Sequence, residues 1–281
     1  MATTYKSFAV VGGGKLGMPI VKALAAQNGV SVILLSRSGT TSEISVPAGV
    51  ALEKVDTADA AAVAAVFAQH GVEVVISTIT SAAVGAQTVL VDAGKRAGVK
   101  LFAPSEFGMS TEGDSKNPKN KVIEYMKGAG VSYARFFVGM ITEFVPFLIG
   151  LKDGKITLAG KGDAPVSFTS LADIAGFVAH VLTILPPSEL ANRTFRIEGD
   201  RSTMSGLGAI FNAEVEHVDK IGGPMGEFKT MMLLMTDTGV GSTGWDAETK
   251  KEKTGSDAAG SANVLWEGHH WRSIKEVHNL A

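Results

Sequence analysis

The chain has 281 residues, of which 45% are hydrophobic, and its formal net charge at pH 7 is −2. This length allows one large domain or a domain with a smaller companion. The small net charge gives no electrostatic footprint for nucleic acid or an anionic membrane, so neither partner is expected. Because the chain has no cysteine, disulfides, thiol catalysis and zinc–thiolate sites are excluded.

The N-terminus enters a strand-like run without the apolar region of a signal peptide. Other apolar runs are too short, or too interrupted by Gly, Pro and charge, to span a bilayer. These features favour a cytoplasmic protein.

The first 137 residues alternate strand and helix patterns. Continuous apolar runs such as 30–35 and 72–78 are typical of strands buried on both faces. The predicted strands are 8–11, 30–35, 50–55, 72–78, 100–103 and 131–137, and the predicted helices are 18–26, 58–69, 85–97 and 118–129. This alternation predicts an α/β fold, a Rossmann doubly wound parallel sheet with helices on both faces.

After residue 139 the pattern loosens and predicts a smaller α+β substrate-binding portion, 140–281, beside a nucleotide-binding domain, 1–139. The elements expected there are a helix at 140–151, strands at 155–158 and 166–169, a helix at 171–184 and a strand at 194–198. Residues 165–185 are expected to pack back onto the first domain. Segment 236–261 is rich in Gly, Thr, Ser, Asp and Lys and predicts a flexible loop, either solvated filler or a lid.

A glycine-rich turn joins the first predicted strand to the first predicted helix. Gly12 suits a tight turn, Gly14 lets phosphates approach the backbone, and Gly17 lets the helix pack on the strand. Ordinary turns also use glycines, but the strand before and the helix after are the context that a dinucleotide fingerprint requires. We therefore expect Gly12, Gly14, Lys15, Leu16 and Gly17 to bind the phosphates of a dinucleotide at the helix N-terminus.

The end of the second strand indicates which dinucleotide binds. NAD-binding units carry an acidic residue there for the ribose 2′-hydroxyl, whereas this chain has Ser36, Arg37 and Ser38. The planar guanidinium of Arg37 suits a 2′-phosphate, although it could also be a solvated surface arginine. The expected cofactor is NADP(H). Thr78, Ile79 and Thr80 should also contact it, because they lie at the end of the fourth strand and in the loop that follows, at the carboxyl edge of the sheet.

Three further segments carry a family resemblance: VVISTITSAAVGAQ at 74–87, LFAPSEFG at 101–108 and KNKVIEYMKGAGVSYARFF at 119–137. Together they resemble the isoflavone reductase-like and NmrA-like family of atypical short-chain dehydrogenases. That family includes pinoresinol-lariciresinol and phenylcoumaran benzylic ether reductases. The resemblance covers about residues 6–200 and implies a reductase of secondary metabolism. The compressed turn GGGKLG departs from the family's G-x-x-G-x-x-G, and substrate identity stays open.

The resemblance also implies a lone catalytic lysine. No tyrosine of the chain has a lysine four residues on, so the Tyr-x-x-x-Lys pair of ordinary short-chain dehydrogenases is absent. The position that matches the family's general acid is Lys119, which should also contact the cofactor. Lys121 is the alternative, about 200° away on the helix. On the residues alone, a solvated basic cluster at a helix start is the favoured interpretation of Lys116, Lys119 and Lys121.

Other site residues follow from the same resemblance. Ser105 and Phe137 should lie beside the cofactor, and Glu106 is either a site residue or part of a capped turn. An aromatic lining suits a small flat aromatic substrate, although such side chains are more often core. The expected lining is Phe107, Met109, Phe136, Gly139, Met140 and Phe144. His269, His270 and Trp271 could close over the site, Asp173 is expected to cap a helix, and no metal-ligand spacing is present.

The sequence therefore predicts an NADPH-dependent reductase. It would transfer hydride to a conjugated C=C, C=N, carbonyl or benzylic ether, with Lys119 as proton donor. The alternative is a non-catalytic NmrA-like regulator that senses NADP(H) and acts through protein partners. The chain is expected to be a monomer or a homodimer.

Overall fold

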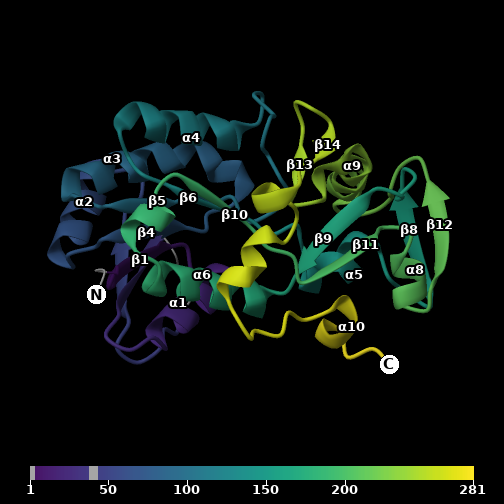
Figure 1. The fold of residues 1–281 in the computed structure, drawn as a ribbon, viewed down its shortest axis with the longest axis horizontal. Coiled ribbons are helices and arrows are strands. Elements are labelled where there is room, and N and C mark those ends of the chain that lie inside the picture. The colour runs from purple at the N-terminus through teal and green to yellow at the C-terminus, as the bar shows by residue number, and fades with distance from the viewer. Residues whose placement is uncertain (1–3, 38–43) are drawn as a thin grey trace. The chain divides into compact units, whose positions relative to one another are not determined.

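The computed structural model describes residues 4–37 and 44–281, and the chain forms two compact units (Figure 1). The first unit comprises Met1–Phe107, Ser115–Phe136 and Ile174–Phe195, and the second comprises Gly108–Asp114, Phe137–Asp173 and Arg196–Ala281. The sequence analysis placed the division after residue 139 with 165–185 returning to the first domain, and in the structure 174–195 belongs to the first unit and 108–114 to the second.

The first unit is built on a five-stranded parallel sheet in the order β3-β2-β1-β4-β5. Its elements are β1 (Ser7–Val11), α1 (Gly17–Ala25), β2 (Ser31–Arg37), β3 (Ala51–Val55), α2 (Ala60–Gln69), β4 (Val74–Ser77), η1 (Ser81–Ala86), α3 (Gln87–Ala97), β5 (Leu101–Ala103), α4 (Pro118–Ala129), β6 (Ala134–Phe137), α6 (Leu171–Ile184), α7 (Pro187–Leu190) and β10 (Arg193–Arg196). The predicted α/β fold is confirmed. Within the sheet the chain order reverses between β1 and β4, which is where open α/β sheets bind ligands.

Helices cover both faces of this sheet. Ala9 and Val11 of β1 pack in one core with apolar residues of α2, α3 and α4, including Phe67 and Leu90. Alternate residues of β1, such as Phe8, are also fully buried, because successive strand side chains point to opposite faces. Figure 1 shows α1 and α6 on the other side of the strands from α2, α3 and α4.

Local signals set the helix limits in this unit. The side chain of Asp59 accepts hydrogen bonds from the first turn of α2, and Asn117 caps α4 ahead of Pro118. A proline fits at this first helical position because its missing N–H would have no intrahelical partner. The predicted limits of these strands and helices agree with the structure to within one to three residues, except that the predicted helix 85–97 is preceded and partly replaced by η1.

The second unit contains short strands and short helices. They are β7 (Met140–Ile141), η2 (Thr142–Phe144), α5 (Val145–Leu148), β8 (Lys155–Ala159), β9 (Pro165–Thr169), β11 (Asp200–Thr203), α8 (Leu207–Ile210), β12 (Glu214–Val218), α9 (Gly226–Met235), η3 (Thr236–Val240), β13 (Trp245–Asp246), β14 (Lys251–Glu252), η4 (Gly255–Asp257), η5 (Ser261–Leu265) and α10 (Ile274–Val277). Small sheets β11-β9-β7 and β12-β8 frame its apolar core.

The predicted helix 140–151 is wrong. Met140 and Ile141 instead form β7, which pairs with Phe168 and Thr169 of β9. A tight turn and a four-residue helix, α5, follow. Pro146 can occupy only the start of that helix. The apolar spacing looked helical, but pairing with a distant strand decides the conformation of its first residues.

Segment 236–261 has more structure than a solvated loop. It contains η3, β13, β14 and η4, and the side chains of Thr236, Ser242 and Thr243 are buried. The Thr243 carbonyl accepts a hydrogen bond from the buried guanidinium of Arg196, 3.0 Å away. Flexibility of this segment stays a prediction. Over 4–37 and 44–281, the structure contains no helix with the length and apolarity needed to cross a membrane.

Candidate functional site

The candidate site lies at the carboxyl edge of the first unit's sheet, where the loops after β1, β4 and β5 are neighbours. Gly12 has a φ of +102°, which L side chains rarely adopt. Its carbonyl accepts a hydrogen bond of 2.8 Å from the hydroxyl of Thr78. This bond fastens the glycine turn to the end of β4.

The other two glycines of the motif meet different surroundings. A Cβ on Gly17 would overlap the carbonyl oxygen of Gly12 and lie 2.6 Å from Oγ1 of Thr78. A Cβ on Gly14 would meet no described atom within 4 Å. Gly17 is therefore required by packing within the protein, whereas the space beside Gly14 is open to a ligand.

A cavity of about 370 Å³ adjoins the turn. It is lined by Val11, Gly12, Gly13, Gly14, Leu35, Ser36, Arg37, Ile44, Thr57, Thr78, Ile79, Thr80, Ala83, Ala86 and Leu90. Arg37 is exposed at this lining. Open backbone at a turn, apolar walls and a guanidinium are what a phosphorylated dinucleotide requires.

Several predicted residues are absent from that lining. Lys15 is exposed and Leu16 is the N-cap of α1. Ser38 lies outside the described residues. The sequence analysis missed Thr57, which follows β3 by two residues. The argument that placed Thr78 in the site applies to Thr57 as well, because the carboxyl ends of all strands of a parallel sheet lie at the same edge.

Ser105 connects two loops of this edge. Its hydroxyl donates a 2.7 Å hydrogen bond to the carbonyl of Ile79, and its N–H donates to the side chain of Gln87 at 2.8 Å. Hydrogen bonds thus link the glycine turn, the loop after β4 and the loop after β5. The next residue in the chain, Glu106, reaches the predicted lysine.

Lys119 lies in the first turn of α4 with only 20% of its side chain exposed. Its Nζ is 4.0 Å from Oε2 of Glu106, whose side chain is 1% exposed. The other carboxylate oxygen of Glu106 is 2.9 Å from Nη2 of Arg135. Arg135 also donates to Oδ1 of Asn120 at 2.9 Å. By contrast, Lys121 is exposed.

Burial lowers the pKa of the Lys119 ammonium below its usual 10.5, because a desolvated charge is unfavourable. Glu106 opposes this change and Arg135 adds to it. The positive end of α4 acts in the same direction as Arg135. A partly buried amine with a lowered pKa can donate and accept protons closer to neutral pH than a surface lysine can.

The predicted substrate-lining residues divide between the units. Phe107 and Phe136 belong to the first unit, where Phe136 is fully buried and stacks on Phe107 and Phe195 at ring distances of 5.6 and 5.1 Å. The others belong to the second unit. Phe137 and Met140 are buried there, Gly139 lies against the backbone of Ser167, and Met109 and Phe144 are partly buried.

The C-terminal residues form an aromatic group in the second unit. His269 stacks on Trp266 at a ring distance of 3.5 Å and meets Trp271 edge-on. Its Nε2 is 2.9 Å from a buried carboxylate oxygen of Asp173. His270 instead pairs with Glu276 at 2.7 Å. Asp173, expected to cap a helix, lies in the first turn of α6, where its N–H donates to the Ser170 hydroxyl and its carboxylate accepts from that hydroxyl. The carboxylate also anchors the C-terminal segment through His269. No metal-binding cluster of His, Asp or Glu occurs in the described part of the chain.

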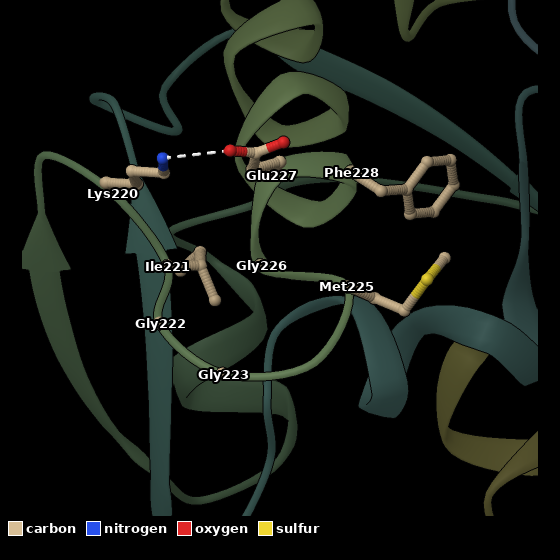
Figure 2. A pocket seen from close by; sticks show the side chains of 8 residues that line it. All are labelled: Lys220, Ile221, Gly222, Gly223, Met225, Gly226, Glu227 and Phe228. Carbon is tan, nitrogen blue, oxygen red and sulfur yellow. Dashed lines mark hydrogen bonds and ion pairs between the residues drawn. The ribbon is translucent and has the colours of Figure 1, made fainter.

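A second cavity, which the sequence analysis missed, lies in the second unit and measures about 700 Å³ (Figure 2). Its lining is Lys220, Ile221, Gly222, Gly223, Met225, Gly226, Glu227 and Phe228. Lys220 and Glu227 form an ion pair of 3.3 Å. Met225 and Phe228 are exposed, and Met231 and Leu234 continue the exposed apolar face along α9. In the sequence, the apolar residues that recur every three positions from 225 to 234 were the signal that could have indicated this face.

Comparison with known proteins gives a family match across most of the chain. The NmrA-like family matches residues 4–244. Oxidoreductase aprR of Aspergillus flavus is 31% identical over 211 residues, which are 69% of each chain. Isoflavone reductase homolog P3 of Arabidopsis thaliana is 28% identical over 234 residues, 73% of each chain.

Solved structures share the fold at lower identity. A crystal structure of isoflavone reductase has a TM-score of 0.75 at 18% identity and covers 98% of this chain and 99% of its own. Leucoanthocyanidin reductase of Vitis vinifera with NADPH has a TM-score of 0.74 at 16% identity, covering 97% and 98%. AtPrR2 with NADP+ and (+)pinoresinol has a TM-score of 0.73 at 21% identity, covering 98% of both chains.

Proposed function

Because the chain belongs to the NmrA-like family, we propose that it is an NADPH-dependent reductase of a small aromatic substrate. The observation that carries this proposal is Lys119, a lysine three-quarters or more buried beside Glu106 and Arg135. A regulator that only binds NADP(H) has no need of a buried proton donor. The reductase names among the relatives and the NADP+ and NADPH complexes among similar folds support it.

The cofactor would bind at the carboxyl edge of the first unit. The turn at Gly12 and Gly14 would receive the pyrophosphate, because its backbone is open and lies at the start of α1. Arg37 would pair with the ribose 2′-phosphate. Thr78 would keep the turn in place through its hydrogen bond to Gly12. When bound, NADPH supplies a hydride for an electrophilic carbon of the substrate.

Lys119 would supply the proton that the reduced substrate needs. Reduction of a C=C, C=N or carbonyl leaves electron density on a carbon, nitrogen or oxygen, and opening of a benzylic ether leaves it on a phenolic oxygen. The Nζ of Lys119 would protonate that atom and recover its proton from solvent. Its lowered pKa makes the amine a stronger acid than a surface lysine.

The test is NADPH oxidation followed at the nicotinamide absorbance against a panel of aromatic enones, imines and benzylic ethers. The expected result is turnover of at least one class by the wild-type chain and by Lys121→Ala, and loss of turnover in Lys119→Ala. If NADPH binds and no class is reduced, the reductase proposal fails.

The exposed apolar face of α9 favours one second candidate, an NADP(H)-sensing regulator that acts through a protein partner. Met225, Phe228 and Met231 expose 57%, 42% and 50% of their surfaces, and apolar patches of this kind are common at protein contacts. This candidate requires NADPH binding without turnover. In either case we expect the chain to act in the cytoplasm as a monomer or a homodimer.

A further inference from the structure

We propose that Glu106 and Arg135 are positioning residues that set the protonation of Lys119 in opposite directions. Glu106 holds the proton on the amine, and Arg135 favours its release. The inference rests on the role proposed above for Lys119, and it adds how the first unit keeps that lysine ready to give up its proton and to take it back.

One carboxylate is shared between two cations. The two oxygens of Glu106 face different partners, Nζ of Lys119 at 4.0 Å and Nη2 of Arg135 at 2.9 Å. The exposed fraction of the side chain is 1% for Glu106, 20% for Lys119 and 8% for Arg135. Because little water reaches these charges, they are screened less than a surface pair, and each change of charge acts strongly on its neighbours.

The three residues are held by elements that do not depend on the ion pairs alone. Glu106 lies between Ser105, which is bonded to the Ile79 carbonyl, and Phe107, which stacks on Phe136. Arg135 is part of β6 and is bonded to Asn120, the residue after Lys119 on α4. A neutral side chain at either position can therefore change the charge while the backbone positions are retained.

Other charged groups do not replace this pair. Glu106 comes from the loop after β5 and Arg135 from β6, while η1, which also packs on α4, has no charged residue. α3 packs on α4 too, but its Asp92 and Lys95 bond to Tyr125 and to the Ala129 carbonyl, further along α4, and its Arg96 is exposed. On α4 and just before it, Lys116, Lys121, Glu124 and Lys127 complete the set, and Glu124 pairs with Lys127.

The signs of the two effects differ. Without the Glu106 charge, burial, Arg135 and the positive end of α4 would all act against the ammonium, so Lys119 would lose its proton at a lower pH. Without the Arg135 charge, the negative charge of Glu106 would act on Lys119 alone, so Lys119 would keep its proton to a higher pH. A role for the pair in packing alone would predict no such opposition.

The test compares Glu106→Gln with Arg135→Gln, using competitive acetylation of lysine amines against pH, with mass spectrometry to resolve Lys119 from Lys121. Glu106→Gln should lower the midpoint pH for Lys119 by about one unit and Arg135→Gln should raise it by about one unit. Lys121 is the internal control and should not move. The alkaline limb of the pH profile of kcat/KM should shift in the same two directions.

Two conservative variants keep the test decisive if a glutamine variant does not fold. Glu106→Asp withdraws the carboxylate from Lys119 and should lower the midpoint by less than Glu106→Gln. Arg135→Lys retains the positive charge, so its midpoint pH for Lys119 should equal that of the wild type. Midpoints that move in the same direction, or that do not move, overturn the inference even if the chain is a reductase. Opposite shifts in a chain that reduces no substrate support the inference about Lys119 and overturn the proposed function.

Discussion

The two units differ in how clearly the sequence marks the residues that make their key contacts. At the carboxyl edge of the first unit, each site segment directly follows a strand: the glycine turn follows β1, Thr78 follows β4 and Glu106 follows β5. In the second unit, Arg196 binds Glu112 and the Thr243 carbonyl, which are 84 and 47 residues away. Sequence patterns that describe strand ends therefore locate the first site, but they do not reveal how the second unit is held together.

The largest expected effect is on Lys119. Lys119→Ala should lower turnover by about a thousandfold, because a positioned general acid contributes about that factor. NADPH affinity should fall far less than turnover, since the glycine turn and Arg37, which would hold the phosphates, are unchanged. Steady-state kinetics and a fluorescence titration check both, and Lys121→Ala should behave as wild type in each. If Lys119→Ala retained turnover, Lys119 would not be the proton donor, and the sheet edge would not supply the catalytic group.

A comparable test in the second unit is Arg196→Met. Its side chain is 1% exposed and joins Glu112 to the 236–261 segment through the Thr243 carbonyl. Loss of one partner of a largely buried ion pair costs about 3 kcal/mol, so the free energy of unfolding in urea should fall by that amount. Hydrogen exchange should increase most at 240–258. If 240–258 exchanges as fast in the wild type, that segment is not docked in the way described.

Two glycines of one turn should respond differently. Gly17→Ala puts a methyl group on the carbonyl oxygen of Gly12 and should lower stability by about 2 kcal/mol without ligand. Gly14→Ala meets open space, so its stability should be that of the wild type while NADPH affinity falls about tenfold or more. Thermal unfolding and NADPH titration separate these outcomes. Normal NADPH affinity in Gly14→Ala would place the phosphates elsewhere.

Arg37→Ala should weaken NADPH binding about tenfold, because charge-assisted hydrogen bonds to a phosphate are worth roughly 1.5–3 kcal/mol. NADH binding should change little, since NADH has no 2′-phosphate. Fluorescence titration of both nucleotides gives the ratio. Equal losses for the two would show that Arg37 does not discriminate between them.

The smallest effect is a pH dependence in the second unit. Burial alone would raise the pKa of Glu112, but Arg196 and Lys253 outweigh it and lower that pKa below its usual 4.5. A carboxyl group with a lowered pKa in the folded state adds stability above its unfolded value and loses it as the pH falls through the folded value. The urea concentration at the midpoint of unfolding should therefore decrease as the pH is lowered below about 4.5. It should decrease less steeply in Glu112→Gln.

The first unit could be predicted from the sequence because its strands are continuous apolar runs and its helices have local caps and proline signals. The fold class, the glycine turn and the cavity residues Arg37 and Thr78 follow from those patterns. The shared carboxylate of Glu106 could not be predicted, because Arg135 is 29 residues away and reaches it only through the order of strands. The burial of Phe136 could not be predicted either. It was expected to line the substrate site, and the alternation of side chains along a strand does not distinguish a lining residue from a core residue.

The most direct test of the central claim is a crystal structure of the chain with NADP+ and an aromatic substrate analogue. The account predicts the pyrophosphate at the turn of Gly12 and Gly14, with the 2′-phosphate on Arg37. Lys119 Nζ should lie within hydrogen-bond reach of the atom to be protonated, about 3 Å directly or through one water. A cofactor bound at the turn with Lys119 directed to solvent, away from the analogue, would contradict the account.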